Sequence, residues 1–195
     1  MLYLSNLTGP KDHPLLQNIY RLHQVIEAGF DGLTKAEKGR TLFRIEPPHG
    51  ELISVLVQSS GAPLWGGKCV GNRLRDFETR VKRWQPKFTV DLNLGFRLRG
   101  CFRKTFYGRE CYRTQRDDIF DRFARKIETS ANLLDIGLKE RRDVEIIKRD
   151  YQIKFPTFTL EGRLSVLDPE NLVQTVTRGL GDEKAFGCGL LSLRF

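Results

Sequence analysis

Apolar residues recur along the chain with two spacings, and these spacings predict the order of its helices and strands. A spacing of three or four residues indicates a helix with one buried face, whereas strict alternation indicates a half-buried strand. The first half of the chain predicts the order strand, helix, strand, strand, weak helix or loop, strand. The predicted strands are residues 1–8, 41–46, 51–60 and 81–90, and the predicted helix is residues 14–28.

The second half of the chain repeats this order. Its predicted strands are residues 95–106, 144–155, 157–167 and 190–193, and its predicted helices are residues 116–137 and 169–178. Two consecutive βαββαβ units are typical of ferredoxin-like folds. We therefore predict an α+β protein of two tandem ferredoxin-like (RRM-like) βαββαβ domains, with limits at residues 1–91 and 94–195.

The helix predicted over residues 14–28 carries a tyrosine and a histidine beside its apolar stripe. At about 100° per residue, His23 falls roughly 70° from this stripe, and Tyr20 lies further round. The two are neighbours on the helix surface because they are three residues apart. We expect them on the flank of the helix and not in the middle of its buried face. The stripe consists of Leu15, Ile19, Leu22 and Ile26.

The helix predicted over residues 116–137 shows a second stripe and ends at Gly137. Two aspartates in its first turn suit the positive helix N-terminus. Its apolar positions are Ile119, Phe123, Ile127 and Ala131.

The strand predicted over residues 95–106 alternates between apolar residues and arginines. Phe96, Leu98 and Phe102 point one way, and Arg97, Arg99 and Arg103 point the other. A strand cannot bury three guanidinium groups unpaired, so this face meets water, carboxylates or phosphates. A phosphate partner and a salt-bridged surface both remain open from the sequence. A second, weaker basic cluster is predicted at a hairpin, where Tyr151 could stack on a base; its members are Lys148, Arg149 and Lys154.

Glycines cluster near the end of the chain, just before the apolar run 190–193. One interpretation is a helix cap followed by a turn into a core strand. The other is a loop whose backbone N–H groups meet a phosphate. The Walker pattern is absent, because no G-K-[ST] follows the glycines. The cluster consists of Gly179, Gly181, Gly187 and Gly189.

The composition favours a polyanionic partner. The 195 residues carry a formal net charge of +9, which points to a nucleic acid before a membrane. We expect no signal peptide, since residues 1–4 lack a basic start and a long apolar core. We also expect no membrane span, since no stretch approaches about 18 apolar residues. The four cysteines are scattered without a C-x-x-C pair. They indicate free thiols in a reducing cytosol, without zinc or a disulfide framework.

Histidines are the main candidates for acid–base chemistry. His13 precedes a proline and His49 lies in a predicted turn, so both are interpreted as surface residues. His23 is better placed, on a well-formed helix one turn from Tyr20. The chain contains no G-x-S-x-G or H-E-x-x-H motif and no His/Cys metal spacing.

These residues carry a resemblance to a known family. The stretch GLGDEKAFGCGLLSL at 179–193 is similar to the C-terminal signature of CasE, the CRISPR repeat-RNA endoribonuclease of Cascade complexes. Five further matches follow in order: Y-L-S at 3–5, Y-x-L-H at 20–23, F-R-x-E at 43–46, L-V-Q-S at 56–59 and F-R-L-R at 96–99. The resemblance covers nearly the whole chain and implies two ferredoxin-like domains.

The resemblance also implies an activity. The family cuts the repeat RNA beside its stem-loop without a metal or other cofactor. The ribose 2′-hydroxyl attacks the phosphate and leaves a 2′,3′-cyclic phosphate and a 5′-hydroxyl. His23 matches the catalytic histidine and Tyr20 its tyrosine helper, and whether His23 is base or acid stays open. The protein is then expected to stay on the mature crRNA with other subunits of the interference complex, in the prokaryotic cytoplasm.

RNA-binding positions follow from the basic residues and the resemblance together: Arg97, Arg99, Arg103, Lys104, Lys148, Arg149, Lys154 and Lys184. Residues 24–29 depart from the L-W-x-L-F that often follows the histidine, which leaves open the cation that stabilises the transition state. Cys101-Phe102 replaces an N-P pair. These departures are compatible with a divergent branch serving a type IV complex as well as type I-E. A non-cleaving subunit that binds the guide RNA is the alternative function, and a housekeeping RNA-binding protein with the same fold is a third.

Overall fold

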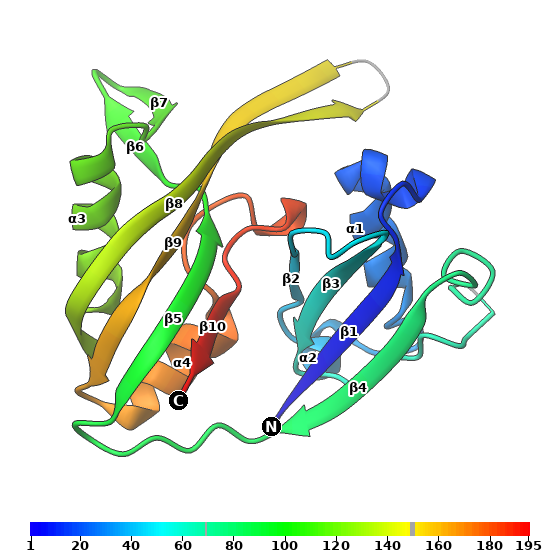
Figure 1. Cartoon of the computed structure of the whole chain (residues 1–195), viewed down its shortest axis with the longest axis horizontal. Coiled ribbons are helices and arrows are strands. Elements are labelled where there is room, and N and C mark those ends of the chain that lie inside the picture. The colour runs from blue at the N-terminus through cyan, green and yellow to red at the C-terminus, as the bar shows by residue number, and fades with distance from the viewer. Residues whose placement is uncertain (69, 149–150) are drawn as a thin grey trace. The chain divides into compact units, whose positions relative to one another are not determined.

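The computed structural model describes residues 1–68, 70–148 and 151–195 (Figure 1). The chain forms two compact units. The first comprises residues 1–86 with short segments at 146–152 and 185–187, and the second comprises residues 87–145, 153–184 and 188–195. The domain limits predicted from the sequence stay a prediction.

The first unit is a four-stranded antiparallel sheet covered by helices. Its strand order is β2-β3-β1-β4, with Ser5 of β1 opposite Val57 of β3 on one side and Val81 of β4 on the other. This is the sheet of a βαββαβ unit, as the sequence predicts. Its elements are β1 (Leu2–Pro10), the 3₁₀ turn η1 (Pro14–Gln17), α1 (Ile19–Ala28), α2 (Lys35–Lys38), β2 (Leu42–Ile45), β3 (Leu52–Ser59) and β4 (Glu78–Trp84).

The core of this unit lies between α1 and the sheet. Leu22 and Ile26 of α1 are fully buried with Leu7 and Val55 of the sheet, and each such side chain contributes about 1.5–3 kcal/mol by leaving water. An irregular segment takes the place of a second long helix. Trp65 in this segment donates its indole N–H to the Ser5 hydroxyl at 3.0 Å, and its other buried residues are Val70, Leu74 and Phe77.

Two predicted elements of the first unit are corrected. The helix predicted over residues 14–28 is interrupted at Asn18, whose extended backbone ends η1 and whose side chain caps the first N–H groups of α1 at 3.1 Å. The strand predicted over residues 81–90 begins at Glu78 and ends at Trp84. Pro86 lies just beyond and has no N–H to donate to a strand partner.

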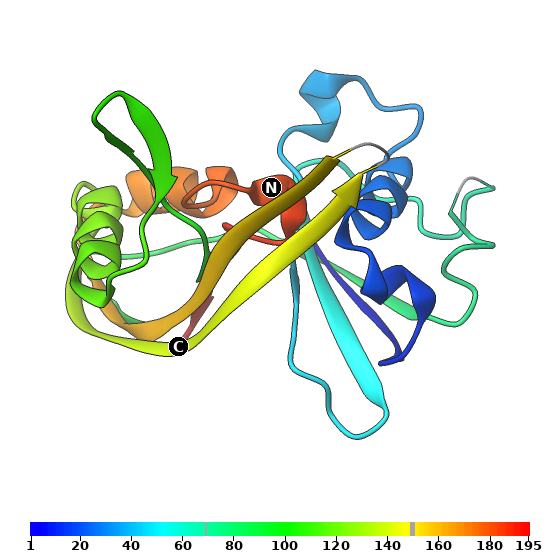
Figure 2. The same ribbon diagram turned by 90° about the horizontal axis from the view of Figure 1, so that it is seen from above.

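The second unit has the same strand arrangement, in the order β10-β5-β9-β8. Helices α3 and α4 cover one face of this sheet, and a separate two-stranded hairpin, β6–β7, stands clear of it (Figures 1 and 2). Its elements are β5 (Asn93–Gly100), β6 (Arg103–Phe106), β7 (Arg109–Tyr112), α3 (Arg116–Ile127), β8 (Ala131–Lys148), β9 (Tyr151–Val166), α4 (Pro169–Arg178), the 3₁₀ turn η2 (Lys184–Phe186) and β10 (Leu191–Arg194).

The helix predicted over residues 116–137 is wrong in its second half. Helix α3 ends at Ile127, and Ala131 to Gly137 belong to β8. The carbonyl oxygen of Ser130 accepts hydrogen bonds from the N–H groups of Leu167 and Asp168, which fixes a turn at this point. The apolar residues after it fit either spacing, and pairing with β9 determines that they form a strand.

The strand predicted over residues 95–106 is too long. Strand β5 ends at Gly100, and β6 begins at Arg103 as part of the separate hairpin. The alternation within β5 is confirmed, because Phe96 and Leu98 are buried while Arg97 and Arg99 are half-buried on the other face.

The glycine cluster forms a loop that returns to β5. The N–H of Asp182 donates to the carbonyl oxygen of Cys101, and the N–H of Gly189 donates to that of Arg99, both at 2.8 Å. Gly181 has φ +89°, and a Cβ there would lie 2.6 Å from the Cys101 oxygen. Strand β10 then pairs with β5, with Leu191 opposite Leu98. The interpretation of residues 190–193 as a core strand is therefore confirmed.

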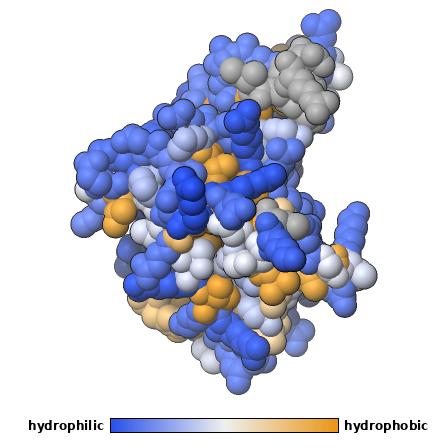
Figure 3. All heavy atoms as spheres, turned by 90° about the vertical axis from the view of Figure 1, so that its right-hand side faces the viewer, coloured by the Kyte–Doolittle hydropathy of each residue, from blue (hydrophilic) through white to orange (hydrophobic). Residues whose placement is uncertain are grey.

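Hydrophilic side chains predominate on the face of the molecule shown in Figure 3, and hydrophobic ones appear there in small scattered groups. Within the described residues, no helix is long and apolar enough to cross a membrane.

Candidate functional site

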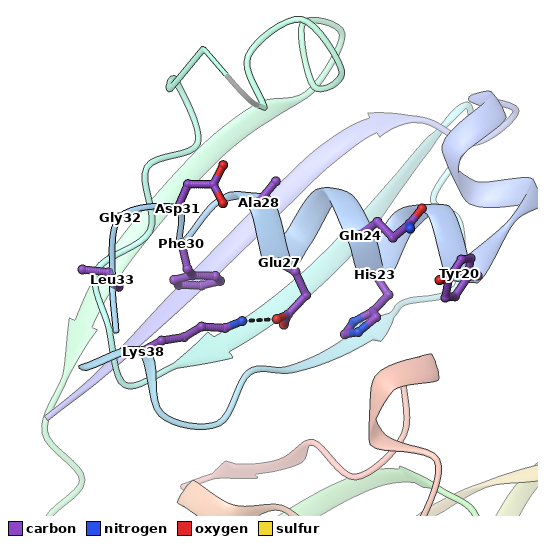
Figure 4. A pocket seen from close by; sticks show the side chains of 10 residues that line it. All are labelled: Tyr20, His23, Gln24, Glu27, Ala28, Phe30, Asp31, Gly32, Leu33 and Lys38. Atoms are coloured by element: carbon purple, nitrogen blue, oxygen red, sulfur yellow. Dashed lines mark hydrogen bonds and ion pairs between the residues drawn. The ribbon is translucent and has the colours of Figure 1, made fainter. Parts of the chain in front are cut away.

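Helix α1 places three functional side chains on one face. Tyr20, His23 and Glu27 are spaced by three and four residues, so they follow one another along the same side of the helix. The Asn18 cap fixes where this helix begins and therefore which way the three side chains point. Figure 4 shows them projecting from α1 to the same side.

An open hollow of about 580 Å³ lies against this face of α1. All of its lining residues belong to the first unit. They are Tyr20, His23, Gln24, Glu27, Ala28, Phe30, Asp31, Gly32, Leu33 and Lys38.

The imidazole of His23 is half-buried and held by an aromatic neighbour. Its ring lies nearly parallel to that of Phe43, with centroids 6.3 Å apart and an interplanar angle of 15°. Burial lowers the pKa of His23 below its ordinary value of 6.5, since a charged ring would lose hydration. Lys38 lowers this pKa further, and Glu27 raises it. The neutral imidazole, which can accept a proton, is therefore the main form at neutral pH.

Lys38 reaches the hollow from helix α2. A capping box begins this helix: the Thr34 N–H donates to the Glu37 carboxylate at 2.8 Å, and the Glu37 N–H donates to the Thr34 hydroxyl at 3.3 Å. The Lys38 ammonium forms an ion pair with Glu27 and lies 5.7 Å from the centre of the Phe30 ring. Sequence reasoning missed Lys38, because nothing in the residue spacing connects α2 with α1.

Gly187 of the C-terminal glycine cluster packs against Phe43, the ring that is stacked on His23. Gly187 belongs to the first unit and has φ +79°. A Cβ there would lie 3.2 Å from the Phe43 ring and 3.4 Å from Ile19. Because Gly187 has no side chain, its backbone can lie close to Phe43, which is stacked on His23, and to Ile19, which precedes Tyr20.

The F-R-x-E match has an internal explanation. Phe43 is the ring stacked on His23, and Arg44 is buried with only 4% of its side chain exposed. Its guanidinium donates to Glu46 at 2.7 Å through Nε, and its terminal nitrogen lies 2.6 Å from the same carboxylate. This ion pair stabilises β2, and neither of its residues lines the hollow.

Two of the predicted RNA-binding arginines share the open face of the second sheet. Arg97 and Arg99 are separated by one residue on β5, and Arg97 lies 3.3 Å from Glu161. The strand register adds Arg163 of β9 and Arg194 of β10, both opposite Gly95, to the same face. Sequence reasoning missed these two, although the alternation of their strands could have indicated them.

Arg103 and Lys104 lie on the β6–β7 hairpin, so the prediction that Arg103 shares a face with Arg97 and Arg99 is wrong. Arg103 forms ion pairs with Glu110, at 3.1 Å, and with Glu183. Lys104 lies 2.7 Å from Asp118. The chain turns away after Gly100, and the buried Phe102 anchors that turn.

The remaining predicted positions are spread over other elements. Lys148 is the last residue of β8, and Arg149 lies outside the described residues. Lys154 is exposed and lies 3.2 Å from Glu145. Lys184 donates to the carbonyl oxygens of Arg178 and Gly179 at 2.9 Å, so its ammonium caps the C-terminal end of α4.

His13, His49 and the cysteines that the structure describes do not line the hollow. His13 accepts from the Leu15 N–H at 3.3 Å and packs edge-on against Phe77. His49 is exposed in the turn between β2 and β3. Burial raises the pKa of Cys188 to about 12, so this thiol stays protonated. Within the described part of the chain, no group of three or more His, Cys, Asp or Glu side chains could hold a metal ion.

Comparison with known proteins places the chain in a family. The profile described as "CRISPR associated protein" matches residues 2–194, and the chain belongs to this family. The CRISPR-associated endoribonuclease Cse3 of Thermus thermophilus is 28% identical, over 91% of this chain and 90% of Cse3. The predicted relationship to the CasE (Cse3) family is therefore confirmed.

Solved structures confirm the fold. The structure of Thermus thermophilus Cse3 bound to an RNA representing a pre-cleavage complex matches with a TM-score of 0.86 and 27% identity, covering 99% of this chain and 98% of that one. Cas6e from Escherichia coli K-12 matches with a TM-score of 0.76 and 24% identity, covering 99% and 98%. The prediction of two tandem ferredoxin-like domains is thus confirmed.

Proposed function

We propose that this protein is a metal-independent endoribonuclease that cleaves CRISPR precursor RNA within the repeat, next to its stem-loop. The products are a 2′,3′-cyclic phosphate and a 5′-hydroxyl. The protein then stays bound to the mature crRNA as a subunit of the interference complex, in the prokaryotic cytoplasm. The relationship to Cse3, an endoribonuclease by name, supports this proposal.

One observation carries the proposal: a half-buried His23 with a lowered pKa lies on the same helix face as Tyr20, beside an open hollow. General acid–base catalysis needs a group that exchanges a proton near neutral pH and that the substrate can reach. The His23 ring stacks on Phe43, and the hollow of about 580 Å³ beside it is large enough for a nucleotide.

The lowered pKa favours His23 as the general base. The ribose 2′-hydroxyl gives its proton to the imidazole while its oxygen attacks the phosphorus atom. The bond from phosphorus to the 5′ oxygen then breaks, which leaves the cyclic phosphate. The departing oxygen takes a proton from the Tyr20 hydroxyl or from water and becomes the 5′-hydroxyl. Proton transfer of this kind contributes about 10²–10⁴-fold to the rate.

Binding of the RNA stem is assigned to the basic residues of the second half of the chain. Double-stranded RNA is recognised mainly through its shape and its phosphates, and paired arginines can exchange a carboxylate for a phosphate. Arg163 and Arg194 extend the surface formed by Arg97 and Arg99. The other proposed contacts are Arg103, Lys104, Lys148, Arg149, Lys154 and Lys184.

The test uses radiolabelled repeat RNA from the protein's own CRISPR locus, with the intact protein and with His23→Ala, in excess EDTA. We expect the intact protein to cut once beside the stem-loop and to leave a cyclic phosphate. The variant should bind the RNA with unchanged affinity and cut it at least about 10²-fold more slowly.

Three results would contradict the proposal in different ways. Loss of cleavage in EDTA rules out the metal-independent reaction, and normal cleavage by His23→Ala removes His23 from the mechanism. Tight repeat binding by the intact protein without any product would favour the non-cleaving subunit.

A further inference from the structure

The proposed reaction concentrates negative charge on the phosphate, and before the reaction begins neither Tyr20 nor neutral His23 carries a positive charge that could bind it. When the 2′ oxygen attacks, the non-bridging oxygens of the phosphate gain charge, and a fixed cation nearby stabilises it. Residues 24–29, which follow His23, contain no lysine or arginine. Among the residues that line the hollow, all of which the structure describes, Lys38 is the one that carries a permanent positive charge.

We propose that Lys38 supplies the cation that stabilises the scissile phosphate, and that Glu27 is the positioning residue that holds its ammonium group on the His23 side of the hollow. The inference rests on the proposed function and extends it. It assigns the charge-stabilising role to a residue of α2, whereas Tyr20 and His23 both belong to α1.

Two hydrogen bonds fix the backbone of Lys38, and a capping box holds the start of its helix. Its N–H donates to the Thr34 carbonyl oxygen at 2.9 Å, and its carbonyl oxygen accepts from Gly61 at 3.2 Å. The capping box of Thr34 and Glu37 holds the other end of α2. The short helix is therefore anchored to the end of β3, and the lysine side chain starts from a defined position.

Contacts with Phe30 and Glu27 also fix the direction of the Lys38 side chain. Phe30 and Glu27 lie along its path, and 20% of the lysine side chain and 34% of the Glu27 side chain are exposed. Glu27 is four residues beyond His23 on α1, so the ion pair brings the ammonium to the same helix face (Figure 4). An ammonium has three N–H donors, and a carboxylate partner that occupies one of them does not prevent contact with a phosphate.

The charge balance of the hollow explains why the pairing is useful. Glu27 and Asp31 are acidic and also line it, so an unpaired Glu27 would repel the phosphate. The ion pair neutralises Glu27 at rest. Asp31 is exposed, and water and salt screen its charge.

A structural reading makes a different prediction. If the ion pair only ties α2 to α1, then loss of Lys38 lowers stability and leaves the chemistry of the folded fraction unchanged. The two readings therefore separate in a measurement that depends on the phosphate itself.

The experiment measures single-turnover cleavage at saturating RNA with Lys38→Met, Lys38→Arg and the control Lys35→Met. Lys35 lies exposed on the same helix, so its substitution removes the same charge without touching the hollow. We expect Lys38→Met to slow cleavage by about 10- to 100-fold, below the effect of a fully buried donor because the site is partly open. Lys38→Arg should retain part of the rate, and Lys35→Met should cleave at the rate of the intact protein.

Sulfur substitution identifies the role. RNA with a phosphorothioate at the cleavage site is prepared as each of its two diastereomers. The intact protein should be slowed by one of them, and Lys38→Met should lose this selectivity. Glu27→Gln should lower the rate less than Lys38→Met does. Adding it to Lys38→Met should cause no further loss, because both changes act on one interaction and the second removes the carboxylate that the first leaves unpaired.

The outcomes are distinguishable from failure of the proposed function. If the intact protein cleaves, His23→Ala does not, and Lys38→Met keeps both the full rate and the sulfur selectivity, then this inference is overturned and the proposed function stands. If the intact protein does not cleave, both are overturned. Should Lys38→Met fold poorly, as thermal unfolding would show, then Lys38→Arg and Glu27→Gln decide the question by the same selectivity measurement.

Discussion

The two units have the same strand arrangement but use their charged residues differently. In the first unit, the hollow beside α1 holds a neutral histidine, a tyrosine and one Lys38–Glu27 pair. In the second unit, arginines lie along an open sheet face and a projecting hairpin, and several pair with carboxylates. Half-buried neutral groups suit proton transfer, whereas an extended row of guanidinium groups suits a phosphate backbone. The difference supports the proposal that one copy of the fold serves chemistry and the other serves binding.

The largest expected effect is the loss of stability when one buried phenylalanine of either unit is replaced by alanine. Phe43 and Phe123 are both almost completely buried, and substitution of either by alanine should lower the free energy of unfolding by about 3–5 kcal/mol. Chemical denaturation measures this loss. Phe43 is stacked on His23, whereas Phe123 is stacked on Phe96 in the other core.

The milder variants Phe43→Leu and Phe123→Leu then separate stability from chemistry. At saturating RNA and under conditions where both are folded, only Phe43→Leu should slow cleavage, since the imidazole loses its aromatic support. Equal cleavage rates for the two variants would contradict the division of roles between the units.

The next effect concerns binding. The double variant Arg97→Ala, Arg99→Ala should weaken RNA binding by about 10- to 100-fold, and the salt dependence of binding should become shallower by about one unit for each lost phosphate contact. Filter binding over a series of salt concentrations measures both. Cleavage at saturating RNA should stay unchanged.

Arg80→Ala is the matched control for this surface. Arg80 is an exposed arginine of β4 that pairs with Glu78 at 2.8 Å, and no sequence match involves it. Its loss should leave the affinity and the salt dependence as they are. If Arg80→Ala weakened binding as much as the double variant does, net charge and not the sheet face would hold the RNA.

A smaller effect is expected at Gly187. Its φ of +79° disfavours any side chain, and an added Cβ would press against Phe43 and Ile19. Gly187→Ala should therefore cost about 1–2 kcal/mol for the backbone alone, with a further loss from the contact. Gly108 has φ +74° and nothing within 4 Å of an added Cβ, so Gly108→Ala measures the backbone cost by itself.

The difference in stability between these two glycine variants measures the cost of crowding Phe43 and Ile19. We expect Gly187→Ala to be the less stable of the two and to cleave more slowly. Similar stability and cleavage rates for both would mean that Gly187 is needed for its conformation alone.

The sequence predicted the elements whose signals are local. Asp168 and Pro169 indicate a helix start, and in α4 the Asp168 carboxylate accepts from the N–H groups of Glu170 and Asn171 at 2.9 and 3.0 Å. The position of His23 on the flank of α1 also follows from spacing, and its half-buried state agrees with that prediction. Such features depend on residues within one or two turns of each other.

The features that the sequence did not predict depend on distant partners. Helix α3 ends at Ile127 because Ser130 is held by the backbone at Leu167 and Asp168. Lys38 reaches the hollow because a loop brings α2 back to α1, and no spacing rule describes that path. The separate hairpin at residues 103–112 follows from a turn after Gly100 that interrupts an otherwise regular alternation.

The smallest expected effect is a shift in the pH dependence of cleavage. The charged or titratable groups that share the hollow with His23 are Tyr20, Glu27, Asp31 and Lys38. If neutral His23 is the base, the single-turnover rate falls as the pH drops through its pKa, and the midpoint lies below 6.5 because burial lowers that pKa. Measuring the rate from weakly acidic to weakly alkaline pH locates the midpoint.

The two partners of the ion pair should move this midpoint in opposite directions. Lys38→Met removes a cation that disfavours protonation of His23, so the pKa rises and the midpoint moves up. Glu27→Gln removes an anion that favours protonation, so the midpoint moves down. Titration of the His23 ring by NMR, with its signal assigned through His23→Ala, checks that the fall in rate at low pH reflects protonation of this residue. A rate that falls as the pH rises through this pKa would instead make His23 the acid, and the proton would then have to leave the 2′-hydroxyl by way of Tyr20 or water.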